Sequence, residues 1–154
     1  MDRLMRGTKV AMLVTDVGFL VYWASTIAGL IPPELAYKDY TNPILSDWNF
    51  SFLVLDVAAS VTGLLSLRRP ETGRALMLVS LTLTSVAGLQ AIAFWTLRGD
   101  FELTWWLPNL ALLLFPLPAI LVLTRSVRPD PAPTPPRRPV PRPVRRGFLR
   151  CQGD

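Results

Sequence analysis

Four long apolar runs alternate with short polar connections along this chain. The runs cover residues 10–31, 48–67, 75–97 and 103–123. Each holds 20 to 23 residues, long enough for a helix to cross the ~30 Å apolar core of a bilayer. Within them only Asp16 and Asp56 carry a formal charge, whereas a soluble helix places charges on its wet face every few residues. The pattern therefore predicts an all-α integral membrane protein, a four-helix bundle.

The segments between and after the runs leave no room for a soluble domain. The three connections hold 16, 7 and 5 residues, so none of them can bury a core. We expect one four-transmembrane-helix domain over residues 1–125, with a structured outer loop at 32–47 and a kink at the prolines of the fourth run. Eight of the fifteen residues at 129–143 are proline, interleaved with arginine. Residues 126–154 are therefore expected to be a disordered, basic, Pro-rich cytoplasmic tail.

Basic residues are distributed unevenly about the four runs. Fourteen of the sixteen lie before the first run, between the second and third, or after the fourth; the other two are Lys38 and Arg98. The positive-inside rule then places both termini in the cytoplasm of a multi-pass protein of the cell membrane. The basic residues behind the net charge of +5 therefore flank the apolar runs and do not lie on a folded soluble face. For this reason we expect no nucleic-acid partner. A signal peptide within residues 1–31, cleaved after Ala28, is the alternative, although Asp16 interrupts a run longer than the usual apolar region of about 7–15 residues.

The composition offers little for metal, cofactor or catalytic chemistry. Histidine is absent and the one cysteine is Cys151, so the commonest ligands of haem and zinc are missing. The sequence contains no Gly-rich phosphate loop, no histidine-containing triad and no metal-ligand spacing. We therefore expect no cofactor, no metal site, no catalytic residue and no enzymatic activity. An enzyme acting on a lipid-soluble substrate is an alternative for which no constellation of residues is visible.

Asp56 is the first of two candidate functional residues inside the apolar runs. An aspartate at a helix centre costs ~2.5–3.5 kcal/mol to insert, so it usually faces the interior of a bundle. Helical rise places Asp56 about 12 Å below the outer boundary, at a similar depth to Trp23, Gln90 and Asn109. These four residues form the predicted binding cluster. The face of Asp56 continues through small residues that let another helix approach closely, namely Ala59, Ser60 and Gly63.

Asp16 is the second candidate, as an intramembrane polar contact. The same count offsets it from Asp56 by roughly 9 Å along the membrane normal, too far for two carboxyl groups to share a proton. Ser80 and Thr82 lie at a depth where they could hydrogen-bond to it. Each aspartate is either a neutral hydrogen-bonded contact between helices, or part of a proton or cation relay or an anchor for a small ligand.

A dense pattern of polar and aromatic residues marks the first outer connection and the helix after it. It consists of Pro32-Pro33-Glu34, Tyr37-Lys38-Asp39-Tyr40, Asn42-Pro43-Ile44-Leu45, Trp48-Asn49, Ser51-Phe52 and Asp56, with Asp16, Tyr22-Trp23 and Thr62-Gly63-Leu64 elsewhere. The pattern resembles the YvaD-like family of small bacterial four-span membrane proteins, over roughly residues 10–70. The resemblance implies that architecture and carries over no catalytic residue. The loop itself is either a tight cap over the helix ends or the mouth of a ligand site above Asp56.

Two functions of different class are consistent with these features. The first is a non-catalytic accessory or structural membrane protein that contacts a membrane-protein partner or a second copy of itself. The second is a small proton-linked carrier or ligand-binding membrane protein that uses Asp56 in the outer-half polar cluster. The lipid bilayer is the expected surrounding in both, and the Arg-rich tail is either a solvated end or a contact for anionic lipid. A cavity reaching Asp56 would favour the second function, and closed packing around it the first.

Overall fold

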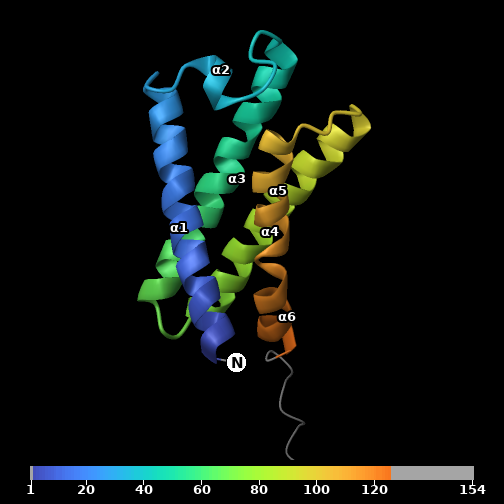
Figure 1. Cartoon of the computed structure of the whole chain (residues 1–154). Coiled ribbons are helices and arrows are strands. Elements are labelled where there is room, and N and C mark those ends of the chain that lie inside the picture. The colour runs from blue at the N-terminus through green and yellow to red at the C-terminus, as the bar shows by residue number, and fades with distance from the viewer. Residues whose placement is uncertain (1, 126–154) are drawn as a thin grey trace, which may run out of the picture.

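The computed structural model describes residues 2–125, and these form six α-helices (Figure 1). In chain order they are α1 (Asp2–Ile27), α2 (Pro33–Ala36), α3 (Pro43–Arg68), α4 (Gly73–Leu97), α5 (Leu103–Leu114) and α6 (Leu117–Arg125). No strand occurs in this part of the chain, so the all-α prediction is confirmed. The tail predicted at 126–154 lies outside the described residues.

Four stretches of helix are long and apolar enough to cross a membrane. They are Arg3–Ile27, Pro43–Arg68, Gly73–Leu97 and Leu103–Arg125, the last of which joins α5 and α6. The N-terminus, the α3–α4 connection and the end of α6 lie at one end of the bundle, which we call the basic end (Figure 1). The helix α2 and the α4–α5 connection lie at the opposite end, which we call the loop end.

The first two of these helices have bounds that differ from the apolar runs. α1 already begins at Asp2, and it stops at Ile27, four residues before the run ends. The chain turns there through Gly29, whose φ of 68° suits a residue without a side chain. α3 begins at Pro43, where the side chain of Asn42 accepts a hydrogen bond from the Ile44 backbone N–H at 3.1 Å. An apolar run thus locates the helix, whereas capping residues decide where it begins and ends.

The fourth stretch is broken, as its prolines predict. α5 ends at Leu114 and α6 begins at Leu117, with Pro116 between them. Proline has no backbone N–H and its ring crowds the preceding turn, so the regular hydrogen-bond ladder is interrupted there. The Ser85 hydroxyl on α4 donates to the Leu113 carbonyl at 2.9 Å across the helix interface. A side chain of a neighbouring helix therefore satisfies a carbonyl beside the break.

α4 lies at the centre of the bundle, where it packs against α3, α5 and α6. Its buried face is made largely of small residues, which allow the neighbouring helices to come close. At Gly88 a Cβ would lie 2.5 Å from the Asn109 carbonyl oxygen and 2.6 Å from the Leu113 nitrogen. The backbone of α5 therefore occupies the space of a side chain at this position. Nearer the basic end the core is a cluster of buried apolar side chains from α1, α4 and α6, namely Met12, Met77, Leu81, Ala119 and Leu123.

Candidate functional site

Asp56 lies on α3 and is hydrogen-bonded to α1. The indole Nε1 of Trp23 donates to Asp56 Oδ2 at 2.9 Å, and only 6% of Asp56 and 4% of Trp23 are exposed. The helical face that carries Asp56 is buried through Ala59, Ser60 and Gly63, as the sequence predicts. Two residues of the predicted binding cluster, Asp56 and Trp23, are thus in direct contact.

A cavity of about 190 Å³ opens onto this pair between α1, α3, α4 and α5. Aromatic side chains supply most of its wall: Phe19, Tyr22, Trp23, Trp48, Phe52, Trp95 and Trp105. The remaining lining residues are Asn49, Asp56, Ala87, Ala91, Asn109 and Leu112. Among these described residues Asp56 is the one with a carboxyl group. The site is therefore an aromatic pocket with a single acidic group, and we call it the Asp56 pocket.

Gln90 is the predicted cluster residue that the structure does not bring to the Asp56 pocket. Asn109 lines the cavity, but Gln90 lies at an exposed position of α4. The buried face of α4 in this region runs through Ala87, Ala91 and Trp95. With about 100° of rotation per residue, Gln90 is turned well away from that face although its depth is similar.

Of the aromatic residues that line the pocket, only Trp23 was predicted as part of the binding cluster. A helical spacing of four places Trp48, Phe52 and Asp56 on one face of α3. The same spacing aligns Ala87, Ala91 and Trp95 on α4. The pocket is lined by these two faces together with residues of α1 and α5. Periodicity was therefore the signal in the sequence that could have identified the pocket.

An ion-pair cluster joins two connections at the loop end, next to the pocket. Lys38 Nζ lies 2.6 Å from Asp100 Oδ2 and 2.6 Å from Glu102 Oε2. It also sits 5.3 Å from the ring centroid of Trp95, which lines the cavity. The hydrogen bonds from Lys38 lower the pKa of Asp100 and of Glu102, and their reciprocal effect raises the pKa of Lys38. The cluster ties residues 38 and 100–102 together above one wall of the pocket.

Asp16 occupies a different and fully enclosed position between α1, α3 and α4. Its exposed fraction is 0%, as is that of Ser80 on α4. Neither carboxyl oxygen of Asp16 nor the Ser80 hydroxyl has a hydrogen-bond partner among the described residues. Both side chains abut Gly63, where an added Cβ would overlap the Asp16 carboxyl group. The Ser60 hydroxyl donates to the Asp16 backbone carbonyl at 3.0 Å. We call this arrangement the Asp16 site.

The Asp16 site agrees in part with the expected contacts. Ser80 lies at Gly63 beside the carboxyl group, but the hydrogen bond expected between them is not formed. Thr82 is exposed on α4, and its hydroxyl donates to the Leu78 carbonyl at 2.8 Å. The two acids belong to separate sites, because Gly63 follows Asp56 on α3 by seven residues, or about 10 Å of helix. Nothing in this arrangement pairs the two carboxyl groups.

The known relatives of this chain have no assigned function. Residues 8–128 match DUF5360, a family of unknown function. The chain is 46% identical over 128 residues to "Uncharacterized protein YvaD" of Bacillus subtilis (strain 168), a match covering 80% of this chain and 96% of the relative. No solved structure matches. The resemblance stated from the sequence pattern is therefore confirmed, and it brings no activity with it.

Proposed function

Because the chain belongs to DUF5360, a family of unknown function, we propose its function from the site itself: it is a membrane protein that binds a small organic cation in the Asp56 pocket. The four long apolar helices support the proposal that the protein lies in a bilayer. Its orientation, with both termini on the cytoplasmic side of the cell membrane, is supported by the arginine and lysine residues gathered at the basic end. The Asp56 pocket then opens in the outer half of the bundle.

The lining of the pocket supports a cation as the ligand. Aromatic rings carry negative charge on their faces, so a cage of rings attracts a cation that still has apolar groups. Asp56 adds a carboxyl group to that cage, and no basic residue is among the described residues that line it. The volume of about 190 Å³ limits the ligand to a small molecule. The single observation that carries the proposal is this cavity of aromatic rings around one acid.

The carrier hypothesis extends the same site. A proton and an organic cation would compete for the Asp56 carboxyl group, so binding of one would release the other. This exchange would link uptake of the cation to pH. It requires no catalytic step, and we propose a binding or carrier protein and not an enzyme.

The test uses choline as the cationic probe and 3,3-dimethylbutan-1-ol as its uncharged analogue of similar shape. Titration of the purified full chain in detergent, followed by tryptophan fluorescence, should show choline binding at least about tenfold tighter than the alcohol. Asp56→Asn keeps an acceptor for the Trp23 indole but removes the charge, so it should abolish this preference. Asp16→Asn is the matched control and should retain it. Equal binding of both probes, or no binding of either to the folded chain, would refute the proposal and favour the accessory or structural function.

A further inference from the structure

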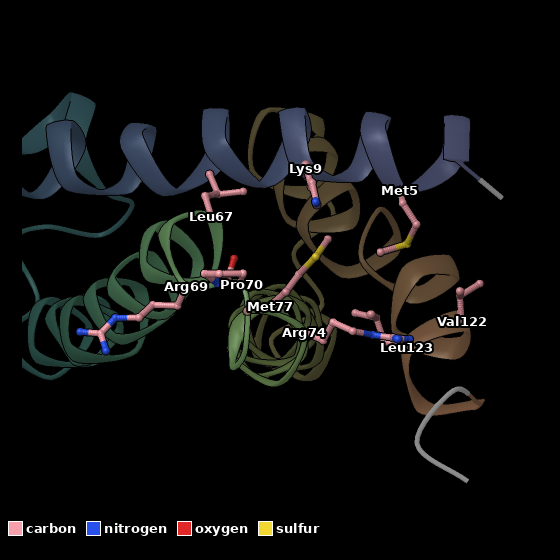
Figure 2. Close-up of a pocket in the computed structure, with 11 residues that line it drawn as sticks. Met5, Lys9, Leu67, Arg69, Pro70, Arg74, Met77, Val122 and Leu123 are labelled. Carbon is pink, nitrogen blue, oxygen red and sulfur yellow. The ribbon is translucent and has the colours of Figure 1, made fainter. Parts of the chain in front are cut away.

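A larger cavity lies at the basic end of the bundle, away from the Asp56 pocket. Its volume is about 670 Å³, and it lies between α1, the α3–α4 connection, α4 and α6 (Figure 2). Met5 and Lys9 line it from α1, and Arg74 and Met77 from α4. We call it the basic-end cavity.

The basic side chains of this cavity form no ion pair with an acid in the described part of the chain. Lys38 at the loop end makes the ion pairs found among residues 2–125, and neither Lys9 nor Arg74 takes part in one. Figure 2 shows Lys9 projecting from α1 into the space and Arg74 extending from α4 towards α6. Arg69 also borders the cavity, but its side chain runs away from the centre. Two cations therefore face a shared space, and no acidic side chain among residues 2–125 forms an ion pair with either of them.

The remaining wall of the basic-end cavity is apolar. Met77 and Leu123 are each 3% exposed and belong to the core, whereas Lys9 and Arg74 are exposed. Met5 and Leu67 extend the apolar wall along α1 and α3. The cavity thus combines cations in the exposed part with thioether and aliphatic groups in the buried part. This combination matches a molecule with an anionic head and a hydrocarbon body.

We propose that the basic-end cavity binds an anionic phospholipid, with Lys9 and Arg74 contacting the phosphate and Met5, Leu67, Met77 and Leu123 contacting an acyl chain. This inference rests on the proposal that the four apolar helices span a membrane, and it is independent of any ligand at Asp56. The chain's own C-terminal segment does not suit the cavity electrostatically, because residues 126–154 contain seven arginines and two aspartates. A basic pocket between helices at the cytoplasmic surface is the setting in which anionic lipid heads bind.

The experiment measures lipid retention by the purified full chain with native mass spectrometry at constant ionic strength. Dioleoylphosphatidylglycerol should bind at least about tenfold tighter than dioleoylphosphatidylcholine, which has the same acyl chains and no net charge. The double variant Lys9→Gln/Arg74→Gln should lose on the order of tenfold or more of the phosphatidylglycerol affinity. Both residues are exposed, so folding should be retained, and the comparison of the two lipids on the unaltered chain needs no variant at all.

Two charge-matched controls separate the cavity from general attraction to basic residues. Arg6→Gln/Arg68→Gln removes two charges at the same end but outside the cavity, and Arg145→Gln/Arg146→Gln removes two from the tail. Each pair should change the affinity less than about twofold.

An equal loss in either control, or no preference between the two lipids, would overturn the proposal. Full competition by soluble glycerol phosphate would also overturn it, by identifying a site for a free anion. Choline binding should be unchanged in the Lys9/Arg74 variant, so this proposal and that for the Asp56 pocket fail separately.

Discussion

The two aspartates inside the long apolar helices have the same chemistry and opposite surroundings. Asp56 is hydrogen-bonded to an indole and borders an open cavity, whereas Asp16 is enclosed, with both carboxyl oxygens unpaired among residues 2–125. A ligand can reach the first carboxyl group and has no route to the second. The comparison teaches that burial of an acid in an apolar helix does not by itself identify a binding site. Access and the neighbouring side chains distinguish the two.

The largest effect is expected from adding a methyl group at Gly63, which borders the Asp16 site. In Gly63→Ala the new methyl group would overlap the carboxyl group of Asp16 and crowd the Ser80 hydroxyl, so these fully enclosed side chains must shift within a packed interface. We expect a loss of about 1–3 kcal/mol in the free energy of unfolding, measured by denaturation in detergent. Gly18→Ala is the matched control, because a Cβ there meets no atom within 4 Å. Equal stability of the two variants would show that the Asp16 site is not tightly packed.

A smaller loss is expected from removing the hydrogen bond at the Asp56 pocket. Trp23→Phe keeps an aromatic ring but deletes the indole N–H that donates to Asp56 at 2.9 Å. We expect it to lower the free energy of unfolding by about 1 kcal/mol. Trp106→Phe deletes a comparable indole bond, to the Asp100 backbone carbonyl at the loop end, where water can replace it. If Trp23→Phe lowered the free energy of unfolding no more than Trp106→Phe does, this would contradict a special role for the Trp23–Asp56 hydrogen bond.

The ion-pair cluster beside the Asp56 pocket should give a pH-dependent contribution to stability. The pKa values of Asp100 and Glu102 lie below their ordinary values of 3.8 and 4.5, so their bonds to Lys38 stabilise the fold above those values. This stabilisation should be lost as pH falls further through the lowered pKa values of the folded protein. The difference in thermal midpoint between the unaltered chain and Lys38→Met should be present at neutral pH and vanish in acid. A difference that does not vary with pH would mean that Lys38 acts through its packing on Trp95.

The smallest effect is expected at the Asp16 carboxyl group itself. Asp16→Asn preserves the size of the side chain, and its amide can donate to the Ser80 hydroxyl, which has no partner among the described residues. We expect stability equal to or slightly above that of the unaltered chain, and unchanged choline binding. The measurements are the unfolding midpoint and the choline titration on one preparation. If a folded Asp16→Asn chain lost pH-dependent uptake in proteoliposomes, Asp16 would belong to a proton relay after all.

The sequence predicted the helices well because long apolar runs determine them directly. It also predicted the Trp23–Asp56 and Asp16–Ser80 neighbours, since helical rise gives the depth of each side chain. Depth says nothing about the direction in which a side chain points around the helix axis. Gln90 and Thr82 lie at suitable depths but are turned to exposed positions of α4. Their depth alone did not indicate this angular position around the helix axis. Which helix faces meet depends on the packing of all four, and a single sequence does not specify it.

The break between α5 and α6 has a mechanical consequence. Above it, Trp105, Asn109 and Leu112 line the Asp56 pocket; below it, Leu123 lines the basic-end cavity. An unbroken helix would transmit a tilt along its whole length, whereas the interrupted hydrogen-bond ladder at Pro116 weakens the coupling between α5 and α6. On the two proposals above, a cation at one end and a lipid at the other would each reshape its own compartment.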